Sequence, residues 1–288
     1  MTQGRELTIA YTPDSDDAFY YFALETGRVR LPGPRPKFHR APMSELNNAA
    51  REGKYHVTAV SSVLYPLIAD AYAVLSVGAS VGRGYGPVLV SRDELGLGDL
   101  AGRPVGVGGV PTTGWLLLRR LCPEAIVVEM PFDRIAEAVS RGELAAGVMI
   151  HEELLFYPRL GLRRVADLGA LWCEETGLPL PVGLNVVRRD LGEPAMRQVC
   201  AAIRRSLLYA QGRRDEALAW VSRFGRGAEG NCTERFVSMF ANEDSVHMPA
   251  DVRDALRMLL CAAVDMGVGD SVPPLDLIEG AAPASAVA

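Results

Sequence analysis

The sequence lacks the features that mark several large functional classes. Thirty basic and 35 acidic residues leave a formal charge of −5 over 288 residues, and no basic run with interleaved aromatic residues is present. Nucleic acid is therefore not expected as a partner. No apolar stretch is long enough to span a membrane, and the polar first residues, 1–6, contain no apolar signal-peptide core. We expect a cytoplasmic protein with no membrane partner.

Cysteine is sparse and its spacing is uninformative for metal binding. The five cysteines are widely scattered and include no C-x-x-C pair. This spacing favours neither a zinc site nor a disulfide framework, and it fits a reducing compartment.

Two common catalytic or cofactor motifs are also missing. Gly106 to Gly109 begins like a dinucleotide-binding loop, but the third glycine of G-x-G-x-x-G would fall at Pro111. No G-x-S-x-G surrounds Ser61, so a hydrolase nucleophile elbow is not indicated.

What is present is the pattern of a two-lobed α/β protein. Strand–helix sets begin near Leu7 and again near Pro104, and mostly helical segments follow from Glu193 onward. We expect a discontinuous larger lobe, residues 1–90 plus 188–288, and a smaller lobe, residues 91–187, with a small-molecule ligand held in the central cleft. The predicted strands 87–90 and 183–187 would cross between the lobes.

The most informative stretch runs from Ala145 to Glu153. A short apolar strand ends abruptly at His151, which Glu152 and Glu153 follow. Ligands of open α/β sheets bind beyond the carboxyl ends of strands, and imidazole exchanges protons near neutral pH. His151 is therefore a candidate catalytic base whose tautomer Glu152 or Glu153 would fix. The simpler alternative is a strand that enters a polar loop.

Two further stretches contain groups suited to an anion. Thr112 and Thr113 lie between a strand and a helix, where hydroxyls and helix N–H groups can bind a carboxylate, although plain helix capping explains them equally well. Arg83 and Gly84, in a glycine-rich loop, could place a guanidinium against a carboxylate. A surface hairpin turn is the alternative for that loop.

The first strand is followed by three carboxylates, Asp14, Asp16 and Asp17. Asp16 or Asp17 is a natural N-cap for the following helix, which Gly27 would end. The cluster could bind a hard cation, but capping and hydrogen bonds to ligand hydroxyls are the preferred interpretation. Ser61 ends another predicted strand, where it could hydrogen-bond a polar ligand.

Several strings, taken together and in order, are similar to those of one enzyme family. They are residues 78–87, 112–113, 148–152, 167–169, 175–181 and 242–245. Over nearly the whole chain they resemble 1,4-dihydroxy-6-naphthoate synthase, a menaquinone-pathway enzyme of the futalosine route. The Ile-His-Glu and Glu-Thr-Gly-Leu-Pro-Leu-Pro strings carry most of this resemblance.

The resemblance implies a fold, an activity and a set of site residues. The fold is the two-lobed, periplasmic-binding-protein-like (type II) α/β architecture. The activity is cleavage of cyclic dehypoxanthine futalosine, a small anionic substrate, to dihydroxynaphthoate and dehypoxanthinylated ribose, with no metal and no organic cofactor. The family's catalytic base falls on His151, and its substrate-binding residues fall on Thr112, Thr113 and Ser61. The oligomeric state stays open, with a homodimer among the options.

The chain departs from the family pattern near the expected cleft. The usual Ser-Pro-Cys-Pro-Asn-Asp-Thr is replaced by residues 12–18, Thr-Pro-Asp-Ser-Asp-Asp-Ala, in which Asp16 and Ala18 stand for asparagine and threonine. The usual Thr-Lys-x-Ser has Ala59 in place of lysine. More carboxylates and one cation fewer should weaken the binding of an anionic substrate.

Three alternatives follow from these departures. A chorismate dehydratase-like enzyme shares the superfamily, but the Ile-His-Glu and Glu-Thr-Gly-Leu-Pro strings argue against it. A solute-binding protein would normally carry an export signal. A non-catalytic cytoplasmic paralogue that only binds a related small carboxylate remains open, because function depends on the site and not on the fold.

Overall fold

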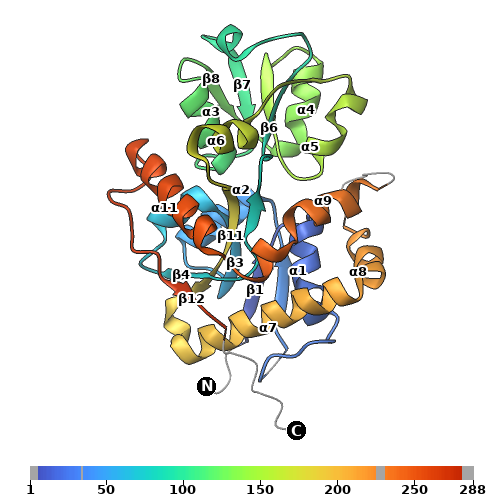
Figure 1. The fold of residues 1–288 in the computed structure, drawn as a ribbon, viewed down its shortest axis with the longest axis vertical. Helices are drawn as coiled ribbons and strands as arrows, with labels where there is room; N and C mark the ends of the chain where they lie inside the picture. Colours follow the sequence, from blue (N-terminus) through green and yellow to red (C-terminus); the bar gives the residue numbers. More distant parts are fainter. Residues whose placement is uncertain (1–5, 34, 225–230, 281–288) are drawn as a thin grey trace.

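Two separate β-sheets organise the chain, each in its own lobe (Figure 1). The structure, a computed structural model, describes residues 6–33, 35–224 and 231–280. The predicted two-lobed α/β architecture is confirmed. Within the described ranges, no helix has the length and apolar character required to cross a bilayer.

The larger lobe is built on a mixed sheet with β11 and β3 at its centre. The strand order is β12-β4-β11-β3-β1-β2, and β5 pairs with β11. β1 is parallel to β2 and β3, whereas β11 is antiparallel to β3, β4 and β5. The strands are β1 (Thr8–Tyr11), β2 (Lys37–Arg40), β3 (Val57–Ser61), β4 (Tyr72–Leu75), β5 (Ser80–Gly82), β11 (Leu180–Arg188) and β12 (Leu277–Ile278).

Helices cover this sheet, and their buried apolar residues recur at helical spacing. The long helix α7 buries Met196, Val199, Cys200, Ile203 and Leu207, which recur at helical spacing and pack against the almost fully buried α1. The helices are α1 (Ser15–Glu25), α2 (Met43–Arg51), η1 (Ser62–Leu67), η4 (Arg189–Leu191), α7 (Glu193–Gly212), α8 (Arg214–Val221), α9 (Cys232–Phe240), α10 (Glu243–Val246) and α11 (Ala250–Asp265).

The smaller lobe has a five-stranded sheet in the order β10-β6-β9-β7-β8. Ile135, Ala138 and Val139 of α4 form the expected buried face, and Gly147 in β9 lets Ile135 approach closely. The strands are β6 (Val88–Ser91), β7 (Pro104–Val107), β8 (Ile126–Glu129), β9 (Ala146–Met149) and β10 (Arg163–Asp167). The helices are η2 (Leu97–Leu100), α3 (Thr113–Leu121), α4 (Phe132–Ser140), α5 (Glu153–Phe156), η3 (Tyr157–Leu160) and α6 (Leu168–Thr176).

The strands place the division between the lobes differently from the sequence prediction. β6 lies in the smaller sheet, because Val88 pairs with Met149 of β9. β11 lies in the larger sheet, because Gly183 pairs with Ser61 of β3. The chain therefore crosses between the lobes in residues 83–87 and 177–179, and neither predicted crossing strand bridges the two sheets.

Two local predictions also need correction. The N-cap position of α1 is Asp14, and Asp16 and Asp17 lie within the first turn of the helix. Residues 171–181, which the sequence predicts as a loop region with a possible helical turn, are helical as far as Thr176 in α6, and Asp167 caps this helix by accepting a hydrogen bond from the Ala170 N–H. The helix then ends at Gly177 in the left-handed conformation, as is common at helix C-termini.

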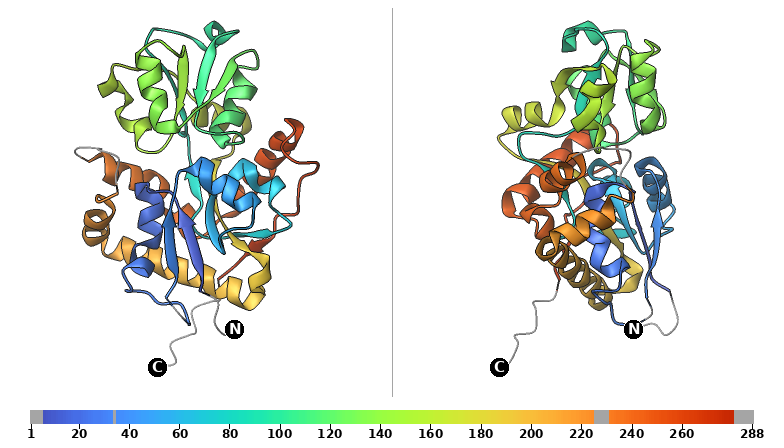
Figure 2. Two further views of the ribbon diagram at one scale, coloured as in Figure 1. Left: turned by 180° about the vertical axis from the view of Figure 1, so that it is seen from behind. Right: turned by 90° about the vertical axis from the view of Figure 1, so that its right-hand side faces the viewer.

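The two lobes also meet through helices that follow the second crossing (Figures 1 and 2). Leu259 and Ala263 of α11 pack in the same apolar cluster as Leu116 and Trp172 of the smaller lobe. Phe236 and Phe240 of α9 join a second cluster with side chains of α4 and α5. A cleft bounded by both lobes is therefore closed on two sides by apolar contacts.

Gly169 provides a test of how the first crossing packs. A Cβ at this position would lie 2.3 Å from the Tyr85 carbonyl carbon and oxygen and 2.4 Å from Gly86 N. Gly169→Ala should lower the free energy of unfolding by roughly 1–3 kcal/mol, because the added methyl group would clash with the backbone of residues 85 and 86 and force it to move. Chemical denaturation measures this change. Gly212→Ala, with nothing within 4 Å of the added methyl group, is the matched control and should not be destabilised. Equal stability of both variants would contradict the described packing.

Candidate functional site

A cavity lies between the two lobes, at the point where several strands of both sheets end. The larger lobe contributes Asp16, Asp17 and Ser61, and the smaller lobe contributes the start of α3 and His151. Apolar side chains such as Trp115 and Phe240 fill much of the remaining wall. None of the described residues that line this cavity is a lysine or an arginine. An anion would therefore have to be held by N–H and hydroxyl groups.

His151 is held from the opposite lobe. Its Nδ1 lies 2.6 Å from Oδ2 of Asp14, whose side chain is fully buried. His151 follows β9 in the smaller lobe, whereas Asp14 precedes α1 in the larger lobe. A carboxylate on one ring nitrogen fixes the tautomer and directs the second nitrogen, Nε2, to proton exchange.

The His151 backbone is in an unusual conformation. Its φ of 56° is the only positive φ found at a non-glycine residue in the described part of the chain. Such conformations are disfavoured by about 1–3 kcal/mol and persist only where the surroundings enforce them. The ring packs edge-on against Phe132, with centroids 4.7 Å apart. Both features indicate that the fold holds this imidazole in one place.

The expected glutamate partner of His151 is an aspartate instead. Glu152 points to the start of α1, where its Oε1 accepts hydrogen bonds from both the N–H (3.0 Å) and the hydroxyl of Ser15. Glu153 begins the short helix α5. Because His151 adopts φ of 56°, the chain turns at this residue and its ring meets Asp14 while Glu152 meets the neighbouring Ser15.

Ser61, Thr112 and Thr113 come together at the start of α3, as the sequence predicts. Thr112 caps the helix, since its Oγ1 accepts from Trp115 N–H and donates to the Gly109 carbonyl. The Ser61 hydroxyl oxygen accepts from Thr113 N–H at 2.9 Å and lies 3.2 Å from Thr113 Oγ1, which itself donates to the Val182 carbonyl. The Ser61 proton is therefore the one that can turn toward a ligand.

Asp16 and Asp17 line the cavity close to one another. Asp17 accepts hydrogen bonds from the N–H and hydroxyl of Thr12, at 3.0 and 2.6 Å, and Asp16 accepts from the Ser80 hydroxyl at 2.8 Å. Burial raises the pKa of Asp17 to about 6, against the effect of the Thr12 hydrogen bonds. Burial, reinforced by the charges of Asp17 and Asp14, raises the pKa of Asp16 well above its usual value. A protonated Asp16 can donate a hydrogen bond to a ligand.

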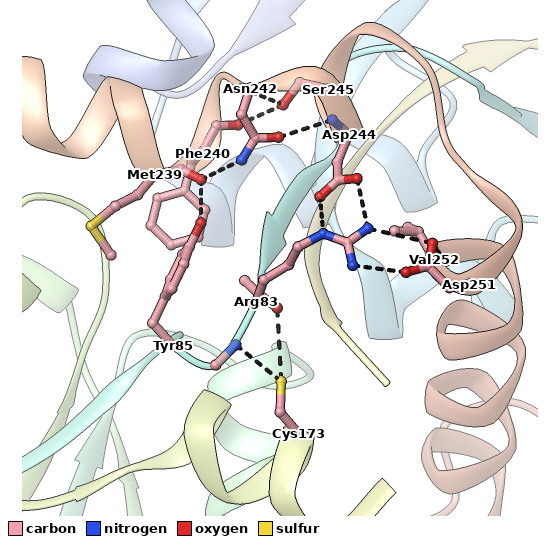
Figure 3. Close-up of polar contacts among 12 residues, drawn as sticks. Arg83, Tyr85, Cys173, Met239, Phe240, Asn242, Asp244, Ser245, Asp251 and Val252 are labelled. Carbon is pink, nitrogen blue, oxygen red and sulfur yellow. Dashed lines mark hydrogen bonds and ion pairs between the residues drawn. The ribbon is translucent and has the colours of Figure 1, made fainter. Parts of the chain in front are cut away.

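Arg83 and Gly84 are not among the residues that line this cavity, contrary to the prediction. Figure 3 shows Arg83 directed at Asp244 and Asp251. The Arg83 guanidinium binds Asp244 through two hydrogen bonds of 2.7 and 2.8 Å and also contacts Asp251 at 2.7 Å. Gly84 N–H donates to the Cys173 sulfur. Arg83 begins the first crossing between the lobes, and its two carboxylate partners on α10 and α11 anchor that crossing to the larger lobe.

Two residues of this region were missed by the sequence analysis. Asp14 was grouped with the other aspartates and not with His151, although the departure from the family motif at this position was a visible signal. Asn47 of α2 accepts from Ser61 N–H through Oδ1 and donates to the Pro111 carbonyl through Nδ2. Nothing in the sequence distinguishes Asn47 from other polar residues of its helix.

The three aspartates do not form a metal site in the described structure. Across residues 6–33, 35–224 and 231–280, no group of three or more histidine, cysteine or carboxylate side chains could hold a metal ion. The residues at the cavity are therefore described by their hydrogen bonds and charges alone.

Comparison with known proteins identifies the family. A family model described as menaquinone biosynthesis matches residues 7–265. A 1,4-dihydroxy-6-naphthoate synthase from Thermus thermophilus is 36% identical over 267 residues, which cover 93% of this chain and 97% of the relative. The Streptomyces coelicolor enzyme of the same name is 33% identical, with coverages of 93% and 96%. The chain belongs to the 1,4-dihydroxy-6-naphthoate synthase family.

Solved structures extend this result to the fold. A protein from Archaeoglobus fulgidus is 38% identical and superposes with a TM-score of 0.88, covering 92% of this chain and 99% of that one. An alkanesulfonate-binding protein from Xanthomonas axonopodis is only 14% identical but has a TM-score of 0.71, with coverages of 96% and 98%. Members of the 1,4-dihydroxy-6-naphthoate synthase family thus share their architecture with periplasmic binding proteins, and the family relationship supports an enzyme of menaquinone biosynthesis.

The buried carboxyl of Asp17 predicts a pH-dependent contribution to stability. Below pH of about 4, both the folded and the unfolded chain hold this proton. Between that pH and about 6 the unfolded chain releases the proton while the folded chain keeps it, so stability falls as the pH rises. The Asp17→Asn variant has no titrating carboxyl at this position, so it does not undergo this fall in stability with rising pH. Its unfolding free energy relative to wild type should therefore increase between pH 4.5 and 7.5, by on the order of 1–3 kcal/mol.

Chemical denaturation at several pH values measures this difference. Asp70→Asn, which alters an exposed carboxyl far from the cavity lining, is the control and should show a difference independent of pH. A flat or declining difference for Asp17→Asn would show that burial of this carboxyl is not costly.

Proposed function

We propose that the protein cleaves cyclic dehypoxanthine futalosine to 1,4-dihydroxy-6-naphthoate and dehypoxanthinylated ribose, with His151 as the general base. The proposal makes the protein a carbon–carbon lyase of the futalosine route to menaquinone. It rests on family membership for the reaction and on the cavity between the lobes for the residues that perform it.

The observation that carries the proposal is the state of His151. The imidazole lines the cavity, its Nδ1 is 2.6 Å from a buried carboxylate, and its backbone is held at a positive φ. In this arrangement Nε2 accepts a proton from the substrate while Asp14 stabilises the imidazolium that forms. The electron pair of the broken bond to hydrogen forms a new π bond on one fragment as the carbon–carbon bond breaks. The other fragment keeps the electron pair of that bond and takes the proton back from the imidazolium.

The start of α3 is the proposed site for the substrate carboxylate. A helix N-terminus favours a negative charge, and here the Ser61 hydroxyl can add a hydrogen bond by turning from Thr113 to the ligand. No lysine or arginine is among the described lining residues, so these dipolar groups replace an ion pair. Asp16 and Asp17, farther along the wall, suit hydroxyl groups of the ribose fragment.

The apolar part of the wall suits an aromatic ring. Trp115, Val148, Leu184 and Phe240 line the cavity and come from both lobes. Closure of the lobes around the substrate would exclude water from the reacting atoms. An aromatic acid joined to a polyhydroxylated fragment therefore matches the distribution of polar and apolar groups.

Turnover by the purified full-length protein tests this function. Wild type should convert cyclic dehypoxanthine futalosine, and formation of 1,4-dihydroxy-6-naphthoate can be followed by chromatography. His151→Ala should lower kcat by about 10²- to 10⁴-fold, because a positioned base contributes this much. His247→Ala, which alters an exposed histidine outside the cavity lining, should retain wild-type activity.

Two other results would contradict the proposal. Turnover of chorismate instead would assign the protein to the dehydratase-like alternative. Binding of the futalosine compound by titration calorimetry, without product from the wild type, would indicate a non-catalytic binder of a related carboxylate.

A further inference from the structure

We propose that Asp14 is a positioning residue that holds the imidazole of His151 from the opposite lobe. The inference rests on the proposed role of His151 as base, and it assigns the group that fixes the tautomer and orientation of that base. It also gives a function to the Asp14 carboxylate, which occupies an N-cap position but makes no capping hydrogen bond.

The position of Asp14 in the chain makes its side chain unusual. Aspartate at an N-cap normally accepts a hydrogen bond from an N–H of the first helical turn. Asp14 occupies the N-cap position of α1 with extended backbone angles, yet its side chain makes no capping hydrogen bond. Its Oδ2 instead lies 2.6 Å from His151 Nδ1. The carboxylate is therefore directed at the imidazole and away from its own helix.

Glu152 takes over the capping role that Asp14 leaves. Its Oε1 accepts from Ser15 N–H at 3.0 Å and from the Ser15 hydroxyl, and its side chain is fully buried. Residues 14 and 15 of one lobe thus contact residues 151 and 152 of the other, in order. Glu152 thus accepts a hydrogen bond from a free N–H of the first turn of α1, and the Asp14 carboxylate is left to contact His151.

The two neighbouring aspartates, Asp16 and Asp17, form hydrogen bonds with other residues. Asp16 accepts a hydrogen bond from Ser80, and Asp17 accepts hydrogen bonds from Thr12. Phe132 packs against the ring and offers no acceptor to Nδ1 from its side chain. Among these neighbours, Asp14 is the one placed to orient the imidazole.

A double-mutant cycle tests the proposal in the full-length protein. Asp14→Asn should lower kcat at least about 10-fold with KM changed by less than about 3-fold, because the carboxylate acts on the base and not on substrate binding. In the His151→Ala background the same substitution should change kcat by less than about 2-fold, because residues that act as a unit are not additive. An equal loss in both backgrounds would overturn the proposal.

Imidazole nitrogen-15 NMR provides a readout independent of turnover. The chain has four histidines, so the His151 signals are assigned by their loss in His151→Ala. Asp14→Ala and Asp14→Asn should both shift these signals and raise the population of the tautomer protonated at Nε2. Glu152→Gln removes one carboxylate from the same junction between the lobes but should leave the His151 signals unchanged, because Glu152 contacts Ser15.

The two readouts separate this inference from the proposed function. If the wild type does not cleave the futalosine compound but Asp14 variants still shift the His151 signals, the reaction is wrong and the positioning contact stands. If the wild type is active and the His151 signals do not respond to either Asp14 variant, Asp14 does not position His151. Far-ultraviolet circular dichroism and denaturation of each variant identify any that fail to fold, and Asp14→Asn, which keeps an acceptor oxygen, is the milder change.

Discussion

The contact between Asp14 and His151 is the interaction on which the functional site depends. It joins the two lobes beside the cavity, because Asp14 follows β1 of one sheet and His151 follows β9 of the other. A histidine supplied by one lobe and its carboxylate by the other form a pair only when the lobes are together. In this structure the pair is already formed, so the imidazole is held in place across the cavity by residues from both lobes.

The charges around the cavity differ from those expected for a site that binds an anion through lysine or arginine. Ala59, Asp16 and Asp17 line the cavity, so its wall is acidic, with no lysine or arginine among its described residues. Burial and the charges of Asp17 and Asp14 raise the pKa of Asp16, which favours its neutral form and so weakens the repulsion of an anion in the cavity. The α3 N-terminus at the other wall supplies the attraction for an anion.

The sequence predicts the fold and part of the site, for identifiable reasons. Periodic apolar residues such as Ile135 and Val199 reveal their helices locally, and strand ends reveal Ser61, Thr113 and His151 as candidates. The partner of His151 could not be predicted, because it lies 137 residues away in the other lobe and depends on the left-handed turn at His151. Arg83 was misassigned because its partners, Asp244 and Asp251, belong to helices far along the chain.

A crystal structure with 1,4-dihydroxy-6-naphthoate bound tests the account most directly. The product should lie between the lobes, with its carboxylate at Ser61 and the start of α3 and with Nε2 of His151 facing the ring. Nδ1 of His151 should remain in contact with Asp14. Product bound outside this cavity, or a His151 ring turned away from both the product and Asp14, would contradict the assignment of the base and of its partner.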